Sequence, residues 1–309
     1  MTTADRTRVA LAPEGTRDWL GDAVLAGGAT IVEPADANAL VWADAQDPAG
    51  LAALLRSHPR IEWVQLPWAG VEPYLEVIRA HPDRIWTCGK GVYAEPVAEH
   101  ALALGLAGLR HLAPYARAGG WTRPEGTNLL GGRVVIIGGG GITTSLLRLL
   151  GGFRCDVTVV RRVPEPMSGA ARVLAMDELD DALAGARLVV LALALTPETR
   201  GVLDRRRLEL LAPDAWVVNV ARGAHIVTAD LVAILAEGRI GGAALDVTDP
   251  EPLPDGHPLW AEPRCLITPH TGNTPAMAVP LLGERVQENV RRRLAGEELL
   301  GPVDPESGY

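Results

Sequence analysis

The chain has 309 residues, of which 48% are hydrophobic and 22% charged, with a net charge of −9. This balance is typical of a globular protein and excludes disordered and collagen-like chains, and the length predicts two domains. The longest apolar runs, at 101–109 and 188–195, are far shorter than the roughly 20 residues of a transmembrane helix. We therefore expect no membrane contact, and the acidic charge without a basic block argues against nucleic-acid binding.

The N-terminus and the cysteines indicate the cellular compartment. The first residues are polar and lack the apolar segment of a signal peptide. Cys88, Cys155 and Cys265 are widely spaced and form no CxxC or Cys/His cluster, so the sequence predicts neither a disulfide framework nor a metal site. Both features favour a cytoplasmic protein.

The first hundred residues alternate short apolar runs with helical patterns. Strands are expected at 9–11, 30–32, 62–66 and 85–87, and helices at 18–26, 48–55 and 73–79. Such alternation is typical of βαβ units, which build a parallel sheet covered by helices. The segment 95–115 then predicts one long helix that is apolar on every side and therefore buried, followed by an irregular loop at 116–132.

A second alternating series fills the rest of the chain. Strands are expected at 133–137, 156–160, 188–193, 215–220, 243–246 and 265–268, and helices at 143–150, 177–184, 229–237 and 277–294. The whole chain is therefore predicted to be an α/β protein with parallel sheets.

A glycine-rich turn joins the first strand of the second series to its helix. Gly138 and Gly140 match the first two glycines of G-x-G-x-x-G, while Thr143 occupies the third position. In this context the glycines allow a tight turn and a close approach of the backbone to a pyrophosphate, which the helix N-terminus then holds. The turn predicts a dinucleotide site; the alternative is a tight turn that binds no ligand.

Two arginines follow the next strand. An NAD site places Asp or Glu there, against the ribose 2′-hydroxyl, but this chain has Arg161 and Arg162. Arginine can bind a 2′-phosphate with its planar fork of donors. The pair therefore favours NADP(H), with NAD(H) as the other possibility, unless both side chains are simply solvated surface.

Charged or titratable residues follow three further predicted strands. Arg222, Glu251 and His270 come shortly after the strands at 215–220, 243–246 and 265–268. Open α/β sheets bind ligands beyond the carboxyl ends of their strands, so the three side chains could converge on one ligand. Any one of them alone would be interpreted as a surface or structural residue.

Six segments carry a family resemblance: GKGVYAEPVAEHALAL, VVIIGGGGIT, LTPETRGVL, NVARG, GAALDVTDPEPLPDGHPLW and ITPHTGN. In these segments and their order, the chain resembles the D-isomer-specific 2-hydroxyacid dehydrogenase family from about residue 62 onward. Its ending, PVDPESGY, is similar to the C-terminal signature of the glyoxylate/hydroxypyruvate reductase branch. The first 60 residues match the family only in pattern.

The resemblance implies a fold of two similar α/β domains, Rossmann-like or flavodoxin-like, each with a parallel sheet. It places the substrate domain at 1–99 plus 277–309 and the NAD(P)-binding Rossmann domain at 100–276, with the active site in the cleft between them. It also implies a homodimer.

The resemblance further implies a role for each matching residue. Arg222 would hold the carboxylate and carbonyl oxygen of the substrate, which suits its bidentate geometry. His270 would be the general acid in reduction and the general base in oxidation, and Glu251 would orient its ring and raise its pKa. The backbone at Ala69 and Gly70 would bind the substrate carboxylate.

Cofactor contacts are implied at positions spread over the second half. Asp246 would fix the nicotinamide carboxamide. Besides the residues already named, contacts are expected at Gly141, Ile142, Ala194, Thr199, Val220, Ala221 and Asn273, and also at Arg222 and His270 themselves. Three positions depart from the family pattern: Ala194 replaces a proline, Gly141 replaces an arginine that meets the pyrophosphate, and Thr143 replaces a glycine.

The remaining histidines are expected to have no catalytic role, and His257 would be a structural turn residue. His100 would be a packed, hydrogen-bonded side chain of the buried helix, whereas His58, His81, His111 and His225 are predicted at the surface. The predicted function is a cytoplasmic, NADPH-preferring reductase of small 2-oxo acids such as glyoxylate or hydroxypyruvate. The alternatives are an NAD-linked D-lactate- or phosphite-type dehydrogenase, and a catalytically silent NAD(P)-sensing protein of the corepressor type.

Overall fold

The computed structural model describes residues 7–15, 18–44 and 46–305. The chain divides into two compact units, one formed by Met1–Tyr93 with Thr274–Tyr309 and the other by Ala94–Asn273. The chain thus leaves the first unit after Tyr93 and returns to it at Thr274. These borders precede the expected ones, at 99/100 and 276/277, by a few residues, and all of the helix that begins at Ala94 belongs to the second unit.

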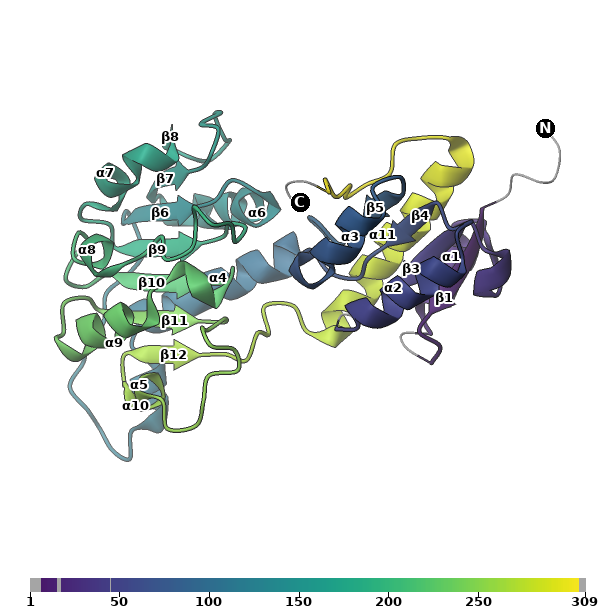
Figure 1. Ribbon diagram of the computed structural model, residues 1–309. Helices are drawn as coiled ribbons and strands as arrows, with labels where there is room; N and C mark the ends of the chain where they lie inside the picture. Colours follow the sequence, from purple (N-terminus) through teal and green to yellow (C-terminus); the bar gives the residue numbers. More distant parts are fainter. Residues whose placement is uncertain (1–6, 16–17, 45, 306–309) are drawn as a thin grey trace. The chain divides into compact units, whose positions relative to one another are not determined.

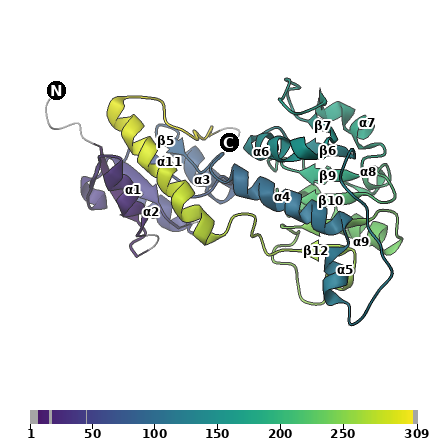
Figure 2. The same cartoon turned by 180° about the vertical axis from the view of Figure 1, so that it is seen from behind.

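The first unit contains a five-stranded parallel sheet in the order β2-β1-β3-β4-β5 (Figure 1). Its elements are β1 (Arg8–Ala12), α1 (Leu20–Ala26), β2 (Thr30–Ile31), η2 (Pro34–Asp36), β3 (Ala39–Trp42), α2 (Pro48–Ser57), β4 (Trp63–Gln65), η3 (Glu72–Tyr74), α3 (Leu75–Ala80), β5 (Ile85–Thr87) and α11 (Pro275–Ala295). Helix α1 packs on α11 (Figure 2). Helix α2 packs on α3. From β1 the chain passes through α1 to β2 at one edge of the sheet, and from β3 it passes through α2 and α3 to β4 and β5 at the other edge. Because such crossovers are right-handed, α1 lies on one face of the sheet and the α2–α3 pair on the opposite face.

Local signals account for most of these elements. Asp47 caps α2, its carboxylate accepting from the Gly50 N–H at 2.7 Å, and Pro48 occupies the first helical turn, where no N–H is needed. Strand β3, which the sequence analysis did not predict, is a run of four buried residues. It is paired on both sides, by β1 and β4, so it shows no polar alternation.

The C-terminal residues complete the first unit. Thr87 in β5 forms an antiparallel bridge with Pro302, and the Val303 N–H donates to the Trp86 carbonyl at 2.9 Å. From α11, the buried Asn289 amide donates to Gln65 in β4 at 2.9 Å. The two ends of the sequence are therefore joined in one hydrogen-bonded structure.

The second unit contains a seven-stranded parallel sheet in the order β12-β11-β10-β9-β6-β7-β8. The strands are β6 (Arg133–Ile137), β7 (Asp156–Val160), β8 (Arg172–Leu174), β9 (Leu188–Leu191), β10 (Trp216–Asn219), β11 (Gly242–Leu245) and β12 (Cys265–Ile267). The helices are α4 (Ala94–Leu109), α5 (Leu112–Arg117), α6 (Gly141–Leu150), α7 (Leu179–Leu183), α8 (Arg205–Leu208), α9 (Thr228–Ala236) and α10 (Pro258–Ala261), with 3-10 turns η4 (Gly151–Phe153), η5 (Met176–Glu178) and η6 (Gly223–His225). The expected α/β class with parallel sheets is confirmed.

Two hydrophobic cores lie on the two faces of this sheet. Successive strand residues point to opposite faces, so Val135 and Ile137 join the core with α7, α8 and α9, while Val134 and Ile136 join the core with α4 and α6. The chain proceeds from β6 to β7 and then, after β8, returns to β9 on the other side of β6. Ligands bind in sheets of this kind at that reversal of strand order.

The expected single helix at 95–115 is two helices. His111 has a φ of 53°, a left-handed conformation that ends α4, and α5 starts at Leu112. Helix α4 packs on α6, β10 and β11, as its apolar sequence predicts. A Cβ at Gly108 would overlap the Trp216 ring, so this glycine permits the close approach of α4 to the sheet.

Candidate active site

The predicted site residues of the second unit come shortly after the carboxyl ends of its strands, and the last paired residues of these strands form one row across the sheet. In the strand register, Val160 pairs with Ile137, Ile137 with Leu191, Leu191 with Asn219, Asn219 with Leu245, and Leu245 with Ile267. Arg161, Gly138, Val220 and Asp246 come directly after this row, and Arg222 and His270 come three residues after it. The parallel strands therefore bring these segments to one edge of the sheet.

The glycine turn has the shape that an anion site requires. Gly138 has a φ of 115°, and a Cβ there would overlap the Ala192 carbonyl at the end of β9. Gly140 caps α6 in an extended conformation and is exposed, and a Cβ at this position would have nothing within 4 Å. The first N–H groups of α6 thus face open space beside Gly140 and Gly141, which fits a bound pyrophosphate.

Thr143 explains one departure from the glycine motif. Its side chain is fully buried, and its hydroxyl donates to the Gly138 carbonyl at 2.8 Å. The hydroxyl therefore satisfies a buried carbonyl of the turn that a glycine would leave to another partner. Ile142, in the same helical turn, is half-buried.

Arg161 lies against the glycine turn. A Cβ at Gly139 would be 2.7 Å from its Cδ and Nε atoms, and its guanidinium is 3.8 Å from the Glu165 carboxylate. Arg162 is exposed. The turn and Arg161 therefore form one surface, on which an adenosine 2′-phosphate could meet the guanidinium.

The loop after β9 contains Ala194 and Thr199. The Thr199 hydroxyl donates to the Ala194 carbonyl at 2.8 Å and accepts from the Thr196 N–H at 2.8 Å. Ala194 itself is exposed, whereas Val220 and Ala221, after β10, are buried. The loop thus keeps a defined shape without the proline that the family has at position 194.

The turn after β10 carries Arg222. The buried Asn219 amide donates to the Arg222 carbonyl at 2.9 Å, and its oxygen accepts from the Ala221 N–H at 3.0 Å. The half-buried Arg222 guanidinium donates to the Ala221 carbonyl at 2.8 Å. Asn219 therefore closes the turn from within and fixes the backbone from which Arg222 projects.

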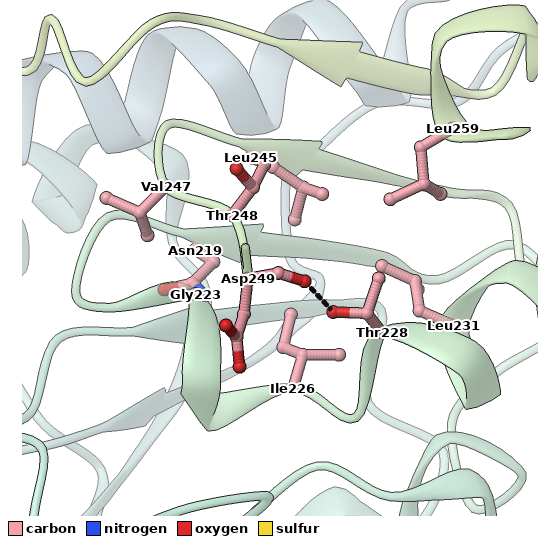
Figure 3. A pocket seen from close by; sticks show the side chains of 10 residues that line it. All are labelled: Asn219, Gly223, Ile226, Thr228, Leu231, Leu245, Val247, Thr248, Asp249 and Leu259. Carbon is pink, nitrogen blue, oxygen red and sulfur yellow. Dashed lines mark hydrogen bonds between the residues drawn. The ribbon is translucent and has the colours of Figure 1, made fainter. Parts of the chain in front are cut away.

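This turn packs directly on the segment that leads to Glu251. Figure 3 shows Gly223, Thr248 and Asp249 around a small pocket, with the Thr228 hydroxyl bonded to the Asp249 carbonyl at 2.8 Å. The rest of the pocket is lined by Asn219 and by apolar side chains: Ile226, Leu231, Leu245, Val247 and Leu259. A Cβ at Gly223 would overlap the Thr248 carbonyl, so only glycine permits this contact between the two segments.

Gly223→Ala is expected to lower kcat/KM about 10- to 100-fold and to destabilise the fold by about 1–3 kcal/mol, since the added methyl must push the Arg222 and Glu251 segments apart. Steady-state kinetics and thermal unfolding measure the two effects. Gly151→Ala is the matched control, because it has a helical φ of −54° and open space around a Cβ. Unchanged kinetics in Gly223→Ala would show that the contact does not position the site.

His270 and Glu251 are in direct contact. The His270 Nδ1 lies 2.7 Å from the Glu251 carboxylate, and both side chains are substantially exposed. His270 has a φ of 52°, and its N–H donates to the Asp246 carbonyl at 2.8 Å. The backbone thus holds an uncommon conformation at a residue whose ring is paired with an acid, as is frequent at functional sites.

Asp246 organises the segment before and after His270. Its buried carboxylate accepts from the Thr268 hydroxyl at 2.6 Å, the Thr271 N–H at 2.8 Å and the Gly272 N–H at 2.9 Å. Burial alone would raise the pKa of Asp246, but these bonds and one from His100 outweigh it and lower the pKa to about 2. His100 is hydrogen-bonded, as expected, and the role of Asp246 toward a carboxamide stays a prediction.

The other expected site residues are placed as follows. Both polar atoms of the Asn273 amide are buried and have no hydrogen-bond partner among the described residues, which fits a group that a ligand completes. Ala69 and Gly70 lie in the first unit, in the turn after β4, and their role stays a prediction. Within the described ranges, no cluster of His, Cys, Asp and Glu could hold a metal ion.

One residue of this site was not predicted. His225, expected at the surface, is completely buried, and its ring bonds to the backbone of Arg222 and Ala194. That expectation is wrong because its partner Ala194 lies on another strand's loop, which the local sequence does not show. The pattern ARGAH, with a titratable residue three positions after the arginine, was the only available signal.

No helix in the described part of the chain has the length and apolar character needed to cross a membrane.

The features of the second unit together define a class of protein. A parallel sheet with a glycine turn where the strand order reverses, and with an arginine and a His–Glu pair at the same edge, defines a dinucleotide-dependent oxidoreductase.

Comparison with known proteins specifies the family. Residues 101–272 match the family described as D-isomer specific 2-hydroxyacid dehydrogenase, NAD binding domain. Glyoxylate/hydroxypyruvate reductase A of Serratia proteamaculans is 32% identical over 289 residues, covering 89% of this chain and 88% of that protein. The chain belongs to the D-isomer-specific 2-hydroxyacid dehydrogenase family, as the sequence motifs predicted, and is an NAD(P)-dependent oxidoreductase of that class.

Two solved structures share the fold. A D-isomer specific 2-hydroxyacid dehydrogenase from Xanthobacter autotrophicus Py2, in complex with NADPH and MES, has a TM-score of 0.82 at 28% identity, covering 99% of this chain and 100% of that one. An NADPH-dependent glyoxylate/hydroxypyruvate reductase from Sinorhizobium meliloti, in complex with NADP and sulfate, has a TM-score of 0.80 at 25% identity, covering 98% and 100%.

Proposed function

We propose that the protein reduces a small 2-oxo acid such as glyoxylate or hydroxypyruvate to the 2-hydroxy acid, with NADPH as the preferred cofactor. The observation that carries the proposal is the His270–Glu251 pair, 2.7 Å apart, at the sheet edge that also holds Arg222 and the glycine turn. Support for the substrate and the cofactor comes from the Serratia and Sinorhizobium reductases and from the NADPH complex of the Xanthobacter protein.

Each polar group would have one task in this reaction. Arg222 would bind the substrate carboxylate, since its planar fork matches two carboxylate oxygens. His270 would donate a proton from Nε2 to the carbonyl oxygen, because its Nδ1 is held by Glu251. The bound nicotinamide supplies the hydride, and the protein supplies binding, orientation and the proton. In the oxidation direction the His270 ring would accept the proton again.

The residues of the second unit fit a dinucleotide. Gly138, Gly140, Gly141 and Ile142 would hold the pyrophosphate at the start of α6, and Arg161 with Arg162 would bind a 2′-phosphate. The nicotinamide end would meet the segments that contain Ala194, Thr199, Val220, Ala221, Asp246 and Asn273. Substrate contacts at Ala69 and Gly70 complete the proposed set.

The decisive experiment is a panel of 2-oxo acids with NADPH and NADH, followed by absorbance of the reduced nicotinamide. We expect turnover of glyoxylate or hydroxypyruvate, with a higher kcat/KM for NADPH than for NADH. Turnover only of pyruvate with NADH, or of phosphite with NAD⁺, would favour a lactate- or phosphite-type enzyme. No turnover in either direction, with cofactor bound, would contradict the reductase proposal.

Arg161→Asp is expected to raise the Kd of NADPH about 100-fold and to change that of NADH little, because only NADPH has the 2′-phosphate that the guanidinium would pair with. Fluorescence titration with each cofactor measures the difference. Arg133→Asp makes the same charge change at the start of β6, at the opposite edge of the sheet from Arg161 and the glycine turn, and should leave both Kd values unaltered. Equal weakening of NADPH and NADH by Arg161→Asp would contradict this role.

We further propose a cytoplasmic homodimer. All three cysteines, Cys88, Cys155 and Cys265, are free, which suits a reducing compartment. The exposed Trp121 and Leu112 of the α5 region are the apolar side chains that an interface between two copies would cover. Light scattering of the purified protein tests the dimer, and a single-chain mass would contradict it.

A further inference from the structure

His225 is a buried titratable residue to which the proposed reaction assigns no task. It ends η6, its side chain is completely buried, and its ring reaches two different segments. Nδ1 lies 3.0 Å from the Arg222 carbonyl oxygen and 3.2 Å from the Arg222 backbone nitrogen, and Nε2 lies 3.2 Å from the Ala194 carbonyl oxygen. One ring therefore touches the turn of the proposed substrate arginine and the loop expected beside the cofactor.

The neighbouring bonds determine which nitrogen carries the proton. The Arg222 carbonyl already accepts from the Asn219 amide at 2.9 Å, so the ring need not donate to it. With hydrogen on Nε2, the ring donates to Ala194 and accepts from the Arg222 N–H, and every polar atom has a partner. Burial lowers the pKa of His225, although the backbone carbonyl oxygens of Ala194 and Arg222, which favour a protonated ring, act in the opposite direction, so the neutral ring is the form present near pH 7.

Beyond Ala194 and Arg222, backbone hydrogen bonds rather than the His225 ring hold the loop after β9 to the segment that contains η6. The Gly201 N–H donates to the Ala224 carbonyl at 2.8 Å, the Leu203 N–H to the His225 carbonyl at 3.0 Å, and the Val227 N–H to the Leu203 carbonyl at 3.0 Å. These backbone bonds persist whatever side chain occupies position 225. Loss of the ring would therefore release mainly Ala194 and the Arg222 backbone.

We propose that His225 is a positioning residue that links the substrate arginine to the cofactor loop, with Nδ1 holding the Arg222 backbone and Nε2 holding the Ala194 carbonyl. The proposal rests on the proposed function, since it takes Arg222 as the substrate contact and Ala194–Thr199 as a cofactor contact. Thr199 shares the Ala194 carbonyl with His225, so both donors define the position of that loop.

Two amide variants separate the two halves of the ring. Asparagine places an amide atom near the position of Nδ1, and glutamine places one near Nε2. His225→Asn should keep the KM for glyoxylate near the wild-type value and raise the Kd of NADPH about tenfold, the effect of one lost buried hydrogen bond. His225→Gln should keep the Kd of NADPH near the wild-type value and raise the KM for glyoxylate. His225→Leu should raise both constants.

Stability must be measured alongside, because a buried histidine also supports the fold. Asp47→Ala is the matched control: it removes a side-chain-to-backbone bond that caps α2 in the first unit, and should lower the melting temperature without changing either constant. A crossed pattern in the Asn and Gln variants supports the proposal. Two results would overturn it. One is that the KM and the Kd change equally in all three His225 variants, in proportion to the loss of melting temperature; the other is that neither constant changes.

The cofactor measurements keep this test distinct from that of the proposed function. If the wild type binds NADPH but turns over no 2-oxo acid, the proposed reaction fails while the Kd of NADPH still decides on His225. In that case a higher Kd for NADPH in His225→Asn than in His225→Gln supports the link to Ala194, and equal Kd values contradict it.

Discussion

His270→Ala is expected to reduce kcat for glyoxylate reduction by about 10²- to 10⁴-fold, the usual contribution of a positioned acid or base, while NADPH still binds. The reason is geometric. The ring is oriented by the Glu251 carboxylate at 2.7 Å, and its backbone N–H donates to the Asp246 carbonyl, so Nε2 would be the proton donor in the proposed reaction. Steady-state kinetics together with a cofactor titration measure both parts of the expectation.

A second histidine provides the control for this experiment. His257 lies in the same unit, where its ring accepts from the Leu259 N–H and caps α10. His257→Ala removes an imidazole and a helix cap but should leave kcat unchanged. Near-normal turnover in His270→Ala would remove His270 from the acid–base role, whereas loss of NADPH binding would show that it serves the cofactor instead.

Arg222→Ala is expected to lower kcat/KM for a 2-oxo acid by about 10²- to 10³-fold, since two charge-assisted hydrogen bonds to the carboxylate would be lost. Arg222→Lys keeps the charge but not the fork, so it should recover only part of this loss. Because Asn219 closes the turn through the Arg222 backbone, the fold should tolerate both changes, and thermal unfolding checks this.

The surface arginine Arg187 provides the matched control. It pairs with Asp214 at 3.3 Å, so Arg187→Ala removes a guanidinium and an ion pair on the surface of the same unit. Its kinetics should equal those of the wild type. An Arg222→Ala enzyme that retains the wild-type KM for 2-oxo acids would place the substrate carboxylate elsewhere.

The sheet edge could be predicted from the sequence because each signal is local. A buried strand followed within a few residues by a glycine turn, an arginine or a histidine is visible in the chain itself, as at Gly138, Arg222 and His270. Parallel pairing then requires that the ends of these strands meet. The direct contact between Glu251 and His270, which lie 19 positions apart, was implied only by the family resemblance, and the structure shows it at 2.7 Å.

The elements that escaped prediction depend on distant partners. Strand β3 is a four-residue apolar run, and only its two neighbouring strands distinguish it from a short core segment. His225 was expected at the surface because its partner Ala194, 31 positions away, is brought to it by the pairing of β9 with β10. The left-handed turn at His111 divides the helix expected at 95–115; the local signal for this break was Pro114, which lies in the first turn of α5, where a proline is tolerated.

The division of the first unit between the two ends of the sequence has a consequence for synthesis on the ribosome. At β5 the Val303 N–H donates to the Trp86 carbonyl and the Cys88 N–H donates to the Gly301 carbonyl, and α1 packs on α11. The second unit is one continuous stretch whose strands are complete at Ile267, so it can fold while the C-terminal residues are still being added. The first unit therefore gains the partners of β5 and α1 only when nearly the whole chain has been made.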